Sequence, residues 1–154
     1  MSVKYIPDGY SSVTPYLIVK GAAAALDFYR KAFGATELFR LEPDEQGRIG
    51  HAEIQIGNSR IMLADEFPER HIVSAESLGN SPVSLLLYVE DVDAVAAQAV
   101  AAGAKVLRPV ADQFYGDRSG WFADPFGHRW GIATHKEDVS PQEMEERMAA
   151  VSKK

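Results

Sequence analysis

Residues 15–35 read PYLIVKGAAAALDFYRKAFGA, and residues 84–104 read SLLLYVEDVDAVAAQAVAAGA. Each stretch begins with a short apolar run rich in strand-forming residues and continues into a helix-forming run. Each helix-forming run ends at a glycine followed by alanine, so that Gly34 in the first stretch matches Gly103 in the second. Because self-similarity at a fixed period indicates a repeated structural unit, the chain is predicted to contain two copies of one module.

Three further strand-like segments follow the helix in each copy, so that each module reads as β-α-β-β-β. The predicted strands cover residues 36–41, 51–56 and 60–64 in the first copy, and 105–109, 117–123 and 129–134 in the second. The last two are joined by Asp124-Pro125-Phe126-Gly127, a sequence typical of a tight turn. The predicted organisation is one domain over residues 1–139, with modules 12–66 and 82–137 and a linker over 67–81, followed by a C-terminal helix over 140–154.

The composition excludes several classes of function. The chain has 154 residues, 46% of them apolar, no cysteine and a formal net charge of −6. Without cysteine there are no disulfides, thiolate nucleophiles or cysteine-ligated metals, and the acidic balance argues against nucleic-acid binding. No apolar stretch is long enough to span a membrane and no secretion signal is visible, so we expect a cytoplasmic protein that acts on a small molecule.

Five segments of the repeat are similar to one known family. The paired modules resemble the vicinal oxygen chelate superfamily, which comprises the glyoxalase, bleomycin-resistance and extradiol-dioxygenase folds, and more narrowly its PhnB-like branch. The segments that carry the resemblance are TPYLIV (14–19), LDFYRKAFGA (26–35), HAEIQIG (51–57), YGDRSG (115–120) and DPFGH (124–128).

The resemblance implies an α+β fold in which the two modules curl their sheets around a shared cavity, and a homodimer in many members. It also implies one divalent metal held by four side chains, usually His and Glu. At the matching positions this chain has Thr14, Met62 (or Leu63, if the register differs by one), Ser84 and Gly131. Because these residues are weak ligands or none for a hard cation, no cofactor is predicted there, and a divalent metal is expected only at a relocated site.

His51 and Glu53 are the candidate catalytic residues. Strand alternation places them on one face, roughly 7 Å apart at ~3.3 Å of rise per residue, while Ala52 and Ile54 face the helices. A carboxylate beside a histidine holds the imidazole in one tautomer, which suits general-base or metal-ligand chemistry. The alternative is a pair that only forms a hydrogen bond at the mouth of the cavity.

Other side chains are candidates for ligand binding. Aromatic residues can stack on a flat ligand, and an arginine can hold an anionic group, although core packing of the rings and an Arg–Asp pair that only braces a loop are the structural alternatives. The candidates are Tyr16, Tyr88, Tyr115, Asp117, Arg118, Trp121 and Arg129.

Two functions remain open on the sequence. One is a binding protein, similar to the bleomycin-resistance proteins, that holds a small organic molecule without chemistry. The other is a metal-dependent lyase, isomerase or dioxygenase with a relocated site around His51 and Glu53. In both cases the expected partners are a small molecule and a second copy of the chain, with no nucleic acid and no membrane.

Overall fold

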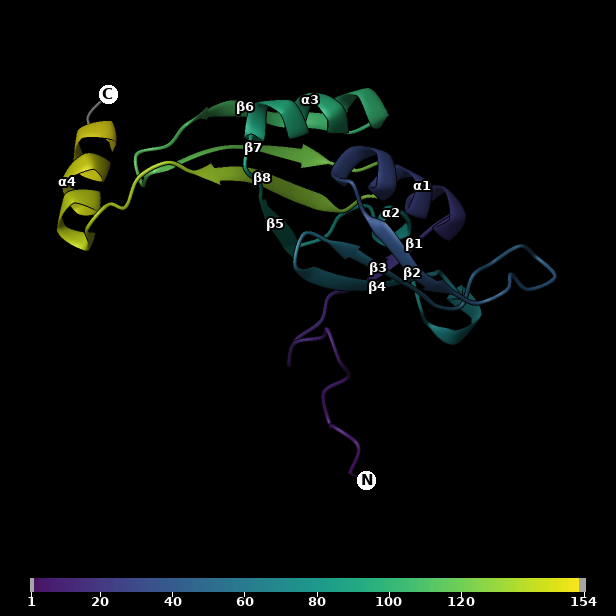
Figure 1. Ribbon diagram of the computed structural model, residues 1–154. Coiled ribbons are helices and arrows are strands. Elements are labelled where there is room, and N and C mark those ends of the chain that lie inside the picture. The colour runs from purple at the N-terminus through teal and green to yellow at the C-terminus, as the bar shows by residue number, and fades with distance from the viewer. Residues whose placement is uncertain (1, 153–154) are drawn as a thin grey trace.

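The two predicted modules are present in the computed structural model of the protein, which describes residues 2–152 (Figure 1). The first module contains β1 (Tyr16–Val19), α1 (Ala22–Phe33), β2 (Thr36–Arg40), β3 (Ala52–Ile56) and β4 (Ser59–Asp65). The second contains β5 (Ser84–Tyr88), α3 (Val92–Ala102), β6 (Lys105–Asp112), β7 (Asp117–Ala123) and β8 (Arg129–His135). Two short helices, η1 (Pro68–Arg70) and α2 (Ala75–Leu78), lie between the modules, and α4 (Pro141–Ser152) follows them.

The strands of the described residues form two four-stranded sheets of the same topology. Their orders are β1-β4-β3-β2 and β5-β8-β7-β6, with the first and fourth strands of each module parallel and the other neighbours antiparallel. Tyr16 lies opposite Met62 in the first sheet, and Leu86 lies opposite Gly131 in the second. The predicted α+β repeat is confirmed.

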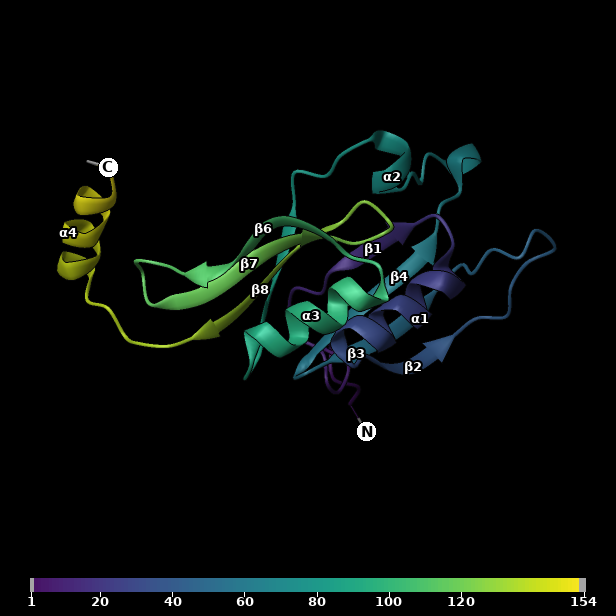
Figure 2. The same ribbon diagram turned by 90° about the horizontal axis from the view of Figure 1, so that it is seen from above.

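The boundaries of the helices follow from residues that the sequence marks. Gly34 ends α1 in the left-handed region, at φ 68°, where a side chain would be strained. Asp91 caps α3 by accepting a hydrogen bond from the backbone N–H of Ala94 at 3.2 Å. The two helices lie side by side and cover one face of the sheets (Figure 2).

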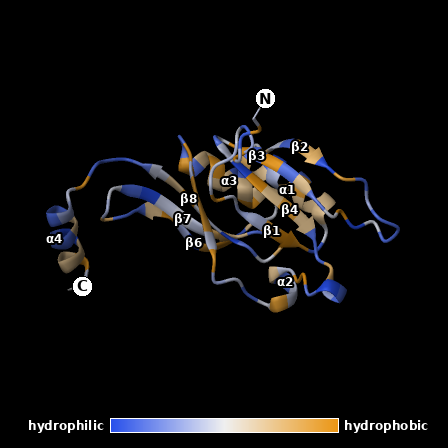
Figure 3. Ribbon diagram, turned by 90° about the horizontal axis from the view of Figure 1, so that it is seen from below, coloured by the Kyte–Doolittle hydropathy of each residue, from blue (hydrophilic) through white to orange (hydrophobic). Residues whose placement is uncertain are grey.

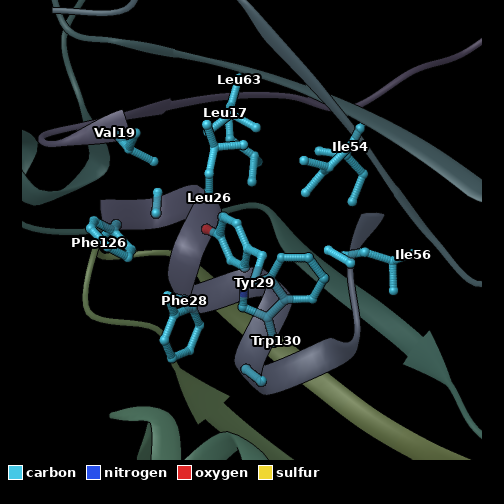
Figure 4. Packing of buried hydrophobic residues seen from close by; sticks show 14 of the residues in the cluster. Leu17, Val19, Leu26, Phe28, Tyr29, Ile54, Ile56, Leu63, Phe126 and Trp130 are labelled. Carbon is cyan, nitrogen blue, oxygen red and sulfur yellow. The ribbon is translucent and has the colours of Figure 1, made fainter. Parts of the chain in front are cut away.

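The core lies between the helices and the covered faces of the sheets. Apolar residues of β1, β3 and β4 pack on α1, and Phe126 and Trp130 of the second module join them (Figure 4). The buried Tyr29 hydroxyl of α1 donates a 2.5 Å hydrogen bond to Asp124, and Trp130 Nε1 donates to the same carboxylate oxygen at 2.9 Å. Burial and this carboxylate raise the pKa of Tyr29 well above its ordinary value. The Asp124 carboxylate therefore forms a buried polar contact between the two modules inside an apolar core.

The opposite faces of the sheets carry exposed apolar side chains. Tyr16 is 46% exposed, Leu86 49% and Tyr88 57%. Figure 3 shows hydrophobic residues along β1 and hydrophilic ones at the end of the β6–β7 hairpin nearest α4. These faces hold the side chains that face away from the helices, so they are where a ligand or another chain has access.

The remaining segments differ in how closely they contact the modules. The segment predicted as a linker, 67–81, contains η1, α2 and an isolated β-bridge between Phe67 and Ile72. The C-terminal helix stands apart from the sheets (Figure 1) and is tied back by Arg147, which donates to Glu137 and to the Phe114 carbonyl. Residues 153–154, included in the predicted helix, lie outside the described residues. Within residues 2–152, no helix has the length and hydropathy required to cross a membrane.

Candidate functional site

The exposed face of the first sheet carries the two predicted catalytic residues. In β3, Ala52 and Ile54 are buried against the helix, and His51 and Glu53 are half-buried on the opposite face, as the alternation predicts. Glu53 lies opposite Met62 of β4, which in turn lies opposite Tyr16 of β1. This register brings Tyr16 of β1, Glu53 of β3 and His51, directly before β3, onto one surface, with β4 between the two strands.

These three side chains form a hydrogen-bonded chain. The hydroxyl of Tyr16 lies 2.7 Å from Nδ1 of His51, and Nε2 of His51 lies 3.2 Å from Oε2 of Glu53. Because an ionised carboxylate only accepts hydrogen bonds, Nε2 of His51 carries the proton. In the neutral imidazole, Nδ1 then accepts the proton of the Tyr16 hydroxyl. The chain therefore fixes both the tautomer of His51 and the direction of the Tyr16 O–H bond.

Two further features concern the protonation of Tyr16 and the hydrogen bonds of Glu53. Burial raises the pKa of Tyr16, so the phenol keeps its proton at neutral pH. Tyr10, from the segment before β1, donates to the second oxygen of Glu53, and Arg60 next to it donates to the Asp8 carbonyl at 3.1 Å. Tyr10 was not among the predicted site residues, because nothing in the local sequence pairs it with a strand 43 residues away.

A pocket of about 460 Å³ lies beside Tyr16. This volume falls within the range of about 300–1,000 Å³ that is typical of ligand sites. The walls combine strand residues with side chains from the segment after β4: Tyr16, Ile18, Ala64, Phe67, Arg70 and Ile72. The loop after residue 66 was expected to influence the shape of the pocket, but none of residues 67–72 was among the predicted site residues, since the only signal there was two apolar residues flanking a short proline-containing turn.

Asp65 also lines this pocket, but its carboxylate is occupied. It accepts hydrogen bonds from the backbone N–H groups of Gly21 (2.7 Å), Ala22 (2.8 Å) and Ile49 (2.7 Å). These bonds join the end of β4 to the start of α1 and to the strand entry at Ile49. Asp65 thus holds the wall of the pocket in place and offers little further hydrogen-bonding capacity to a ligand.

A second polar cluster lies on the other sheet, around the buried Asp117. Its carboxylate accepts a 2.9 Å hydrogen bond from the Tyr88 hydroxyl and lies 2.7 Å from Nδ1 of His135. Nε2 of His135 lies 2.8 Å from Asp138. Hydrogen bonds to Asp117 and then Asp138 raise the pKa of His135, and the bond to Asp117 raises that of Tyr88. Two predicted ligand-binding residues, Tyr88 and Asp117, are therefore bonded to each other.

Arg118 is held by carboxylates of neighbouring elements. It donates two hydrogen bonds to Asp93 of α3, at 2.9 and 3.0 Å, and one to Asp112 of β6 at 3.3 Å. These carboxylates raise the pKa of its guanidinium. The arrangement matches a bracing role, with partners other than the adjacent Asp117.

The remaining candidates lie on or beside the second sheet. The guanidinium carbon of Arg129 is 5.9 Å from the ring centre of Trp121, and the Tyr115 hydroxyl is 3.5 Å from Ser119 Oγ. The structure thus divides the candidates in two, with Tyr16, His51 and Glu53 on the first sheet and the others on the second.

In the vicinal oxygen chelate superfamily four positions hold a metal ion, and the residues at these positions in this protein do not suit one. Met62, not Leu63, shares the face of Glu53, because Leu63 is buried in the core. A β-carbon at Gly131 would lie 2.6 Å from Leu86 and 2.9 Å from Trp121, so apolar side chains fill that place.

The donors left at these positions are the hydroxyls of Thr14 and Ser84 and a thioether, a poor set for a hard divalent cation. Among residues 2–152 no group of three or more His, Asp or Glu side chains is arranged to hold a metal ion.

Comparisons with known proteins agree with this architecture. The family model of the glyoxalase/bleomycin resistance protein/dioxygenase superfamily matches residues 11–132. An uncharacterized protein of Mycobacterium bovis is 40% identical over 142 residues, which cover 90% of this chain and 93% of the relative.

Among solved structures, TioX from Micromonospora sp. ML1 is 26% identical with a TM-score of 0.63, over 84% of this chain and 100% of that one. A PhnB protein from Bacillus cereus is 21% identical with a TM-score of 0.64, over 80% and 99% respectively, and shows the same fold. On the family model, the relative and the repeat together, the chain belongs to the glyoxalase/bleomycin resistance protein/dioxygenase superfamily.

Proposed function

We propose that the protein binds a small organic molecule in the pocket beside Tyr16. The observation that carries the proposal is a pocket of ligand size lined by mostly apolar side chains and by Tyr16, whose hydroxyl is oriented by His51. Phe67 supplies an aromatic contact to a flat molecule, and Ile18 and Ile72 supply aliphatic contacts. A planar, mostly apolar molecule with one or two polar groups matches these walls.

A homodimer is part of the proposal, and the surface area of the chain supports it. The accessible surface is 9847 Å², whereas a compact monomer of 16.9 kDa is expected to expose about 7,700 Å². The excess of roughly 2,100 Å² per chain is larger than the roughly 800 Å² that each partner buries in a standard interface, and two such chains would together fall in the range of about 2,000–5,000 Å² typical of obligate dimers. The exposed apolar faces of both sheets and the outlying α4 are the surfaces that a second copy would cover.

Sedimentation at micromolar concentration tests the dimer. The expected result is a species of twice 16.9 kDa, and a species of 16.9 kDa alone contradicts it.

A cytoplasmic location also belongs to the proposal, supported by a cysteine-free, acidic composition.

A second function is favoured by the hydrogen-bonded chain itself. Tyr16 is placed to accept a proton from a bound substrate while it passes its own to Nδ1 of His51, and Glu53 stabilises the imidazolium that forms. Among the enzyme classes expected from the sequence, this proton transfer fits a lyase or an isomerase. The binding function has priority because the pocket alone supports it.

His51→Ala separates the two functions. Binding is measured by calorimetry with planar aromatic compounds, and turnover of each bound compound is followed by mass spectrometry. Unchanged affinity without turnover in either protein supports the binding function. Turnover by the wild type that is lost in His51→Ala, at unchanged affinity, supports the enzyme. Failure of every planar compound to bind in millimolar concentration contradicts the proposal.

A further inference from the structure

The segment Phe67–Ile72 forms a tight loop at the pocket. Phe67 and Ile72 exchange two backbone hydrogen bonds, of 2.8 and 3.1 Å, and the N–H of Arg70 donates to the Phe67 carbonyl at 2.9 Å. His71 closes the turn at φ 60°, the one non-glycine residue with positive φ among residues 2–152. A non-glycine residue keeps such a backbone conformation only where the surrounding structure holds it. The backbone positions from which the side chains of this loop extend are therefore fixed.

A salt bridge ties the loop to the rest of the first module. Arg48 donates to Glu69 of the loop at 2.8 Å and to Asp44 at 3.0 Å. Its guanidinium carbon also lies 4.3 Å from the ring centre of Phe67, and that of Arg70 lies 5.6 Å from the same ring. Phe67 is thus contacted by two guanidinium groups. Glu69, the acidic residue adjacent to Arg70, forms its salt bridge with Arg48.

Arg70 is the cation of this loop that carries no ion pair within the described part of the chain. The nearby carboxylates in the sequence are engaged elsewhere, since Asp65 accepts three backbone N–H bonds. Glu66 accepts from Ser74 N–H and from the Ser77 hydroxyl, each at 2.9 Å, and these bonds lower its pKa. Arg70 therefore brings a guanidinium without an ion pair to the pocket, whose wall also contains the hydrogen-bonded carboxylate of Asp65.

We propose that the pocket selects an aromatic carboxylate. In this arrangement the ring of the ligand packs against Phe67 and its carboxylate meets the fork of Arg70, which is suited to two parallel hydrogen bonds. The other polar side chains of the pocket are those of Tyr16 and of Asp65, whose carboxylate already accepts three backbone N–H groups. The inference rests on the proposed binding function and adds to it the charge and the class of the ligand.

The test compares 1-naphthoate with 1-naphthamide, which has the same ring and no charge. Affinities are measured by calorimetry at pH 7 on the full chain for the wild type, Arg70→Gln and Arg129→Gln. Arg129 is the matched control, because its guanidinium also lies near an aromatic ring, that of Trp121 on the other sheet. Arg70 is exposed, so its replacement is expected to leave the fold intact, and thermal unfolding of each variant verifies this.

We expect the wild type to bind the naphthoate about tenfold more tightly than the amide, the value of a charge-assisted hydrogen bond. Arg70→Gln should remove that preference and keep the affinity for the amide, and Arg129→Gln should keep the preference. Equal binding of both compounds by the wild type overturns the inference and leaves the pocket standing. A preference that survives in Arg70→Gln, or that disappears in Arg129→Gln, also overturns it. If neither compound binds, both the inference and the binding of aromatic molecules in this pocket fail.

Discussion

The hydroxyl of Tyr16 lies 2.7 Å from Nδ1 of His51, and the other ring nitrogen of that histidine faces Glu53. The bond crosses from β1 to the start of β3, with β4 between them, so the sheet itself sets the distance. The result is a tyrosine whose hydroxyl has a fixed direction and whose side chain lines a pocket of ligand size. This relationship is the basis of the account of function given above.

Tyr16→Phe should weaken ligand binding by about five- to tenfold, because the loss of one hydrogen bond changes the free energy of binding by about 1 kcal/mol. Tyr88→Phe is the matched control, since that tyrosine also has its hydroxyl bonded to a side chain but lies on the second sheet. Calorimetry with the planar compounds measures both. Equal effects of the two substitutions would show that the ligand is not held beside Tyr16.

Asp124→Ala should lower the free energy of unfolding by about 3 kcal/mol, because it leaves the buried hydroxyl of Tyr29 and the indole N–H of Trp130 without an acceptor. Urea denaturation measures the change. Asp27→Ala is the comparison, as its carboxylate pairs with Arg30 and Lys31 on the exposed side of α1, and surface pairs contribute about 0–1 kcal/mol. Similar losses in both variants would contradict the role of Asp124 as a buried polar link between the modules.

His135 should make stability depend on pH. Its pKa is raised above the ordinary value of 6.5, mainly by Asp117, in the folded protein. The charged imidazole therefore stabilises the fold fully below pH 6.5, and this contribution is lost as the pH rises through the higher folded pKa. We expect the stability of the wild type relative to His135→Gln to fall over that range in urea denaturation. A difference that is constant with pH, or an NMR titration of His135 at or below 6.5, would contradict the prediction.

Metal analysis tests the prediction that the four family ligand positions bind no divalent metal in this protein. After incubation with nickel, zinc, manganese or iron(II) and removal of free metal, we expect less than one ion per subunit, because Thr14, Met62, Ser84 and Gly131 are a poor ligand set. Elemental analysis of the purified protein measures the ratio. If one ion per subunit is retained by the wild type and lost in His51→Ala, a metal binds instead at the hydrogen-bonded pair of His51 and Glu53.

Local patterns in the sequence were sufficient to predict the fold. The matching glycines at 34 and 103 end the two helices, and Asp124 begins the turn before β8, where Gly127 N–H donates to its carbonyl at 3.3 Å. The alternation in β3 also placed His51 and Glu53 on the face away from the helices. Each of these features depends on residues within one element or turn.

The rest of the candidate site depends on contacts between distant residues. The carboxylate of Asp124 was expected only to start a turn, and its bond to Tyr29 joins residues 95 positions apart. Arg118 meets Asp93 at a separation of 25 residues. The position of Arg70 at the pocket follows from the β-bridge between Phe67 and Ile72, and no periodic pattern in the sequence predicts this bridge. Such pairings are decided by tertiary packing rather than by local preference.

Methyl NMR on isoleucine-labelled protein shows directly whether a small molecule binds beside Tyr16. Ile18 and Ile72 line the proposed pocket, whereas Ile56 and Ile61 line a separate hollow of about 170 Å³ near β5. On titration with 1-naphthoate, we expect the Ile18 and Ile72 methyl signals to shift and those of Ile56 and Ile61 to stay unchanged. Shifts confined to Ile56 and Ile61, or no shift at a concentration at which calorimetry detects binding, would contradict it.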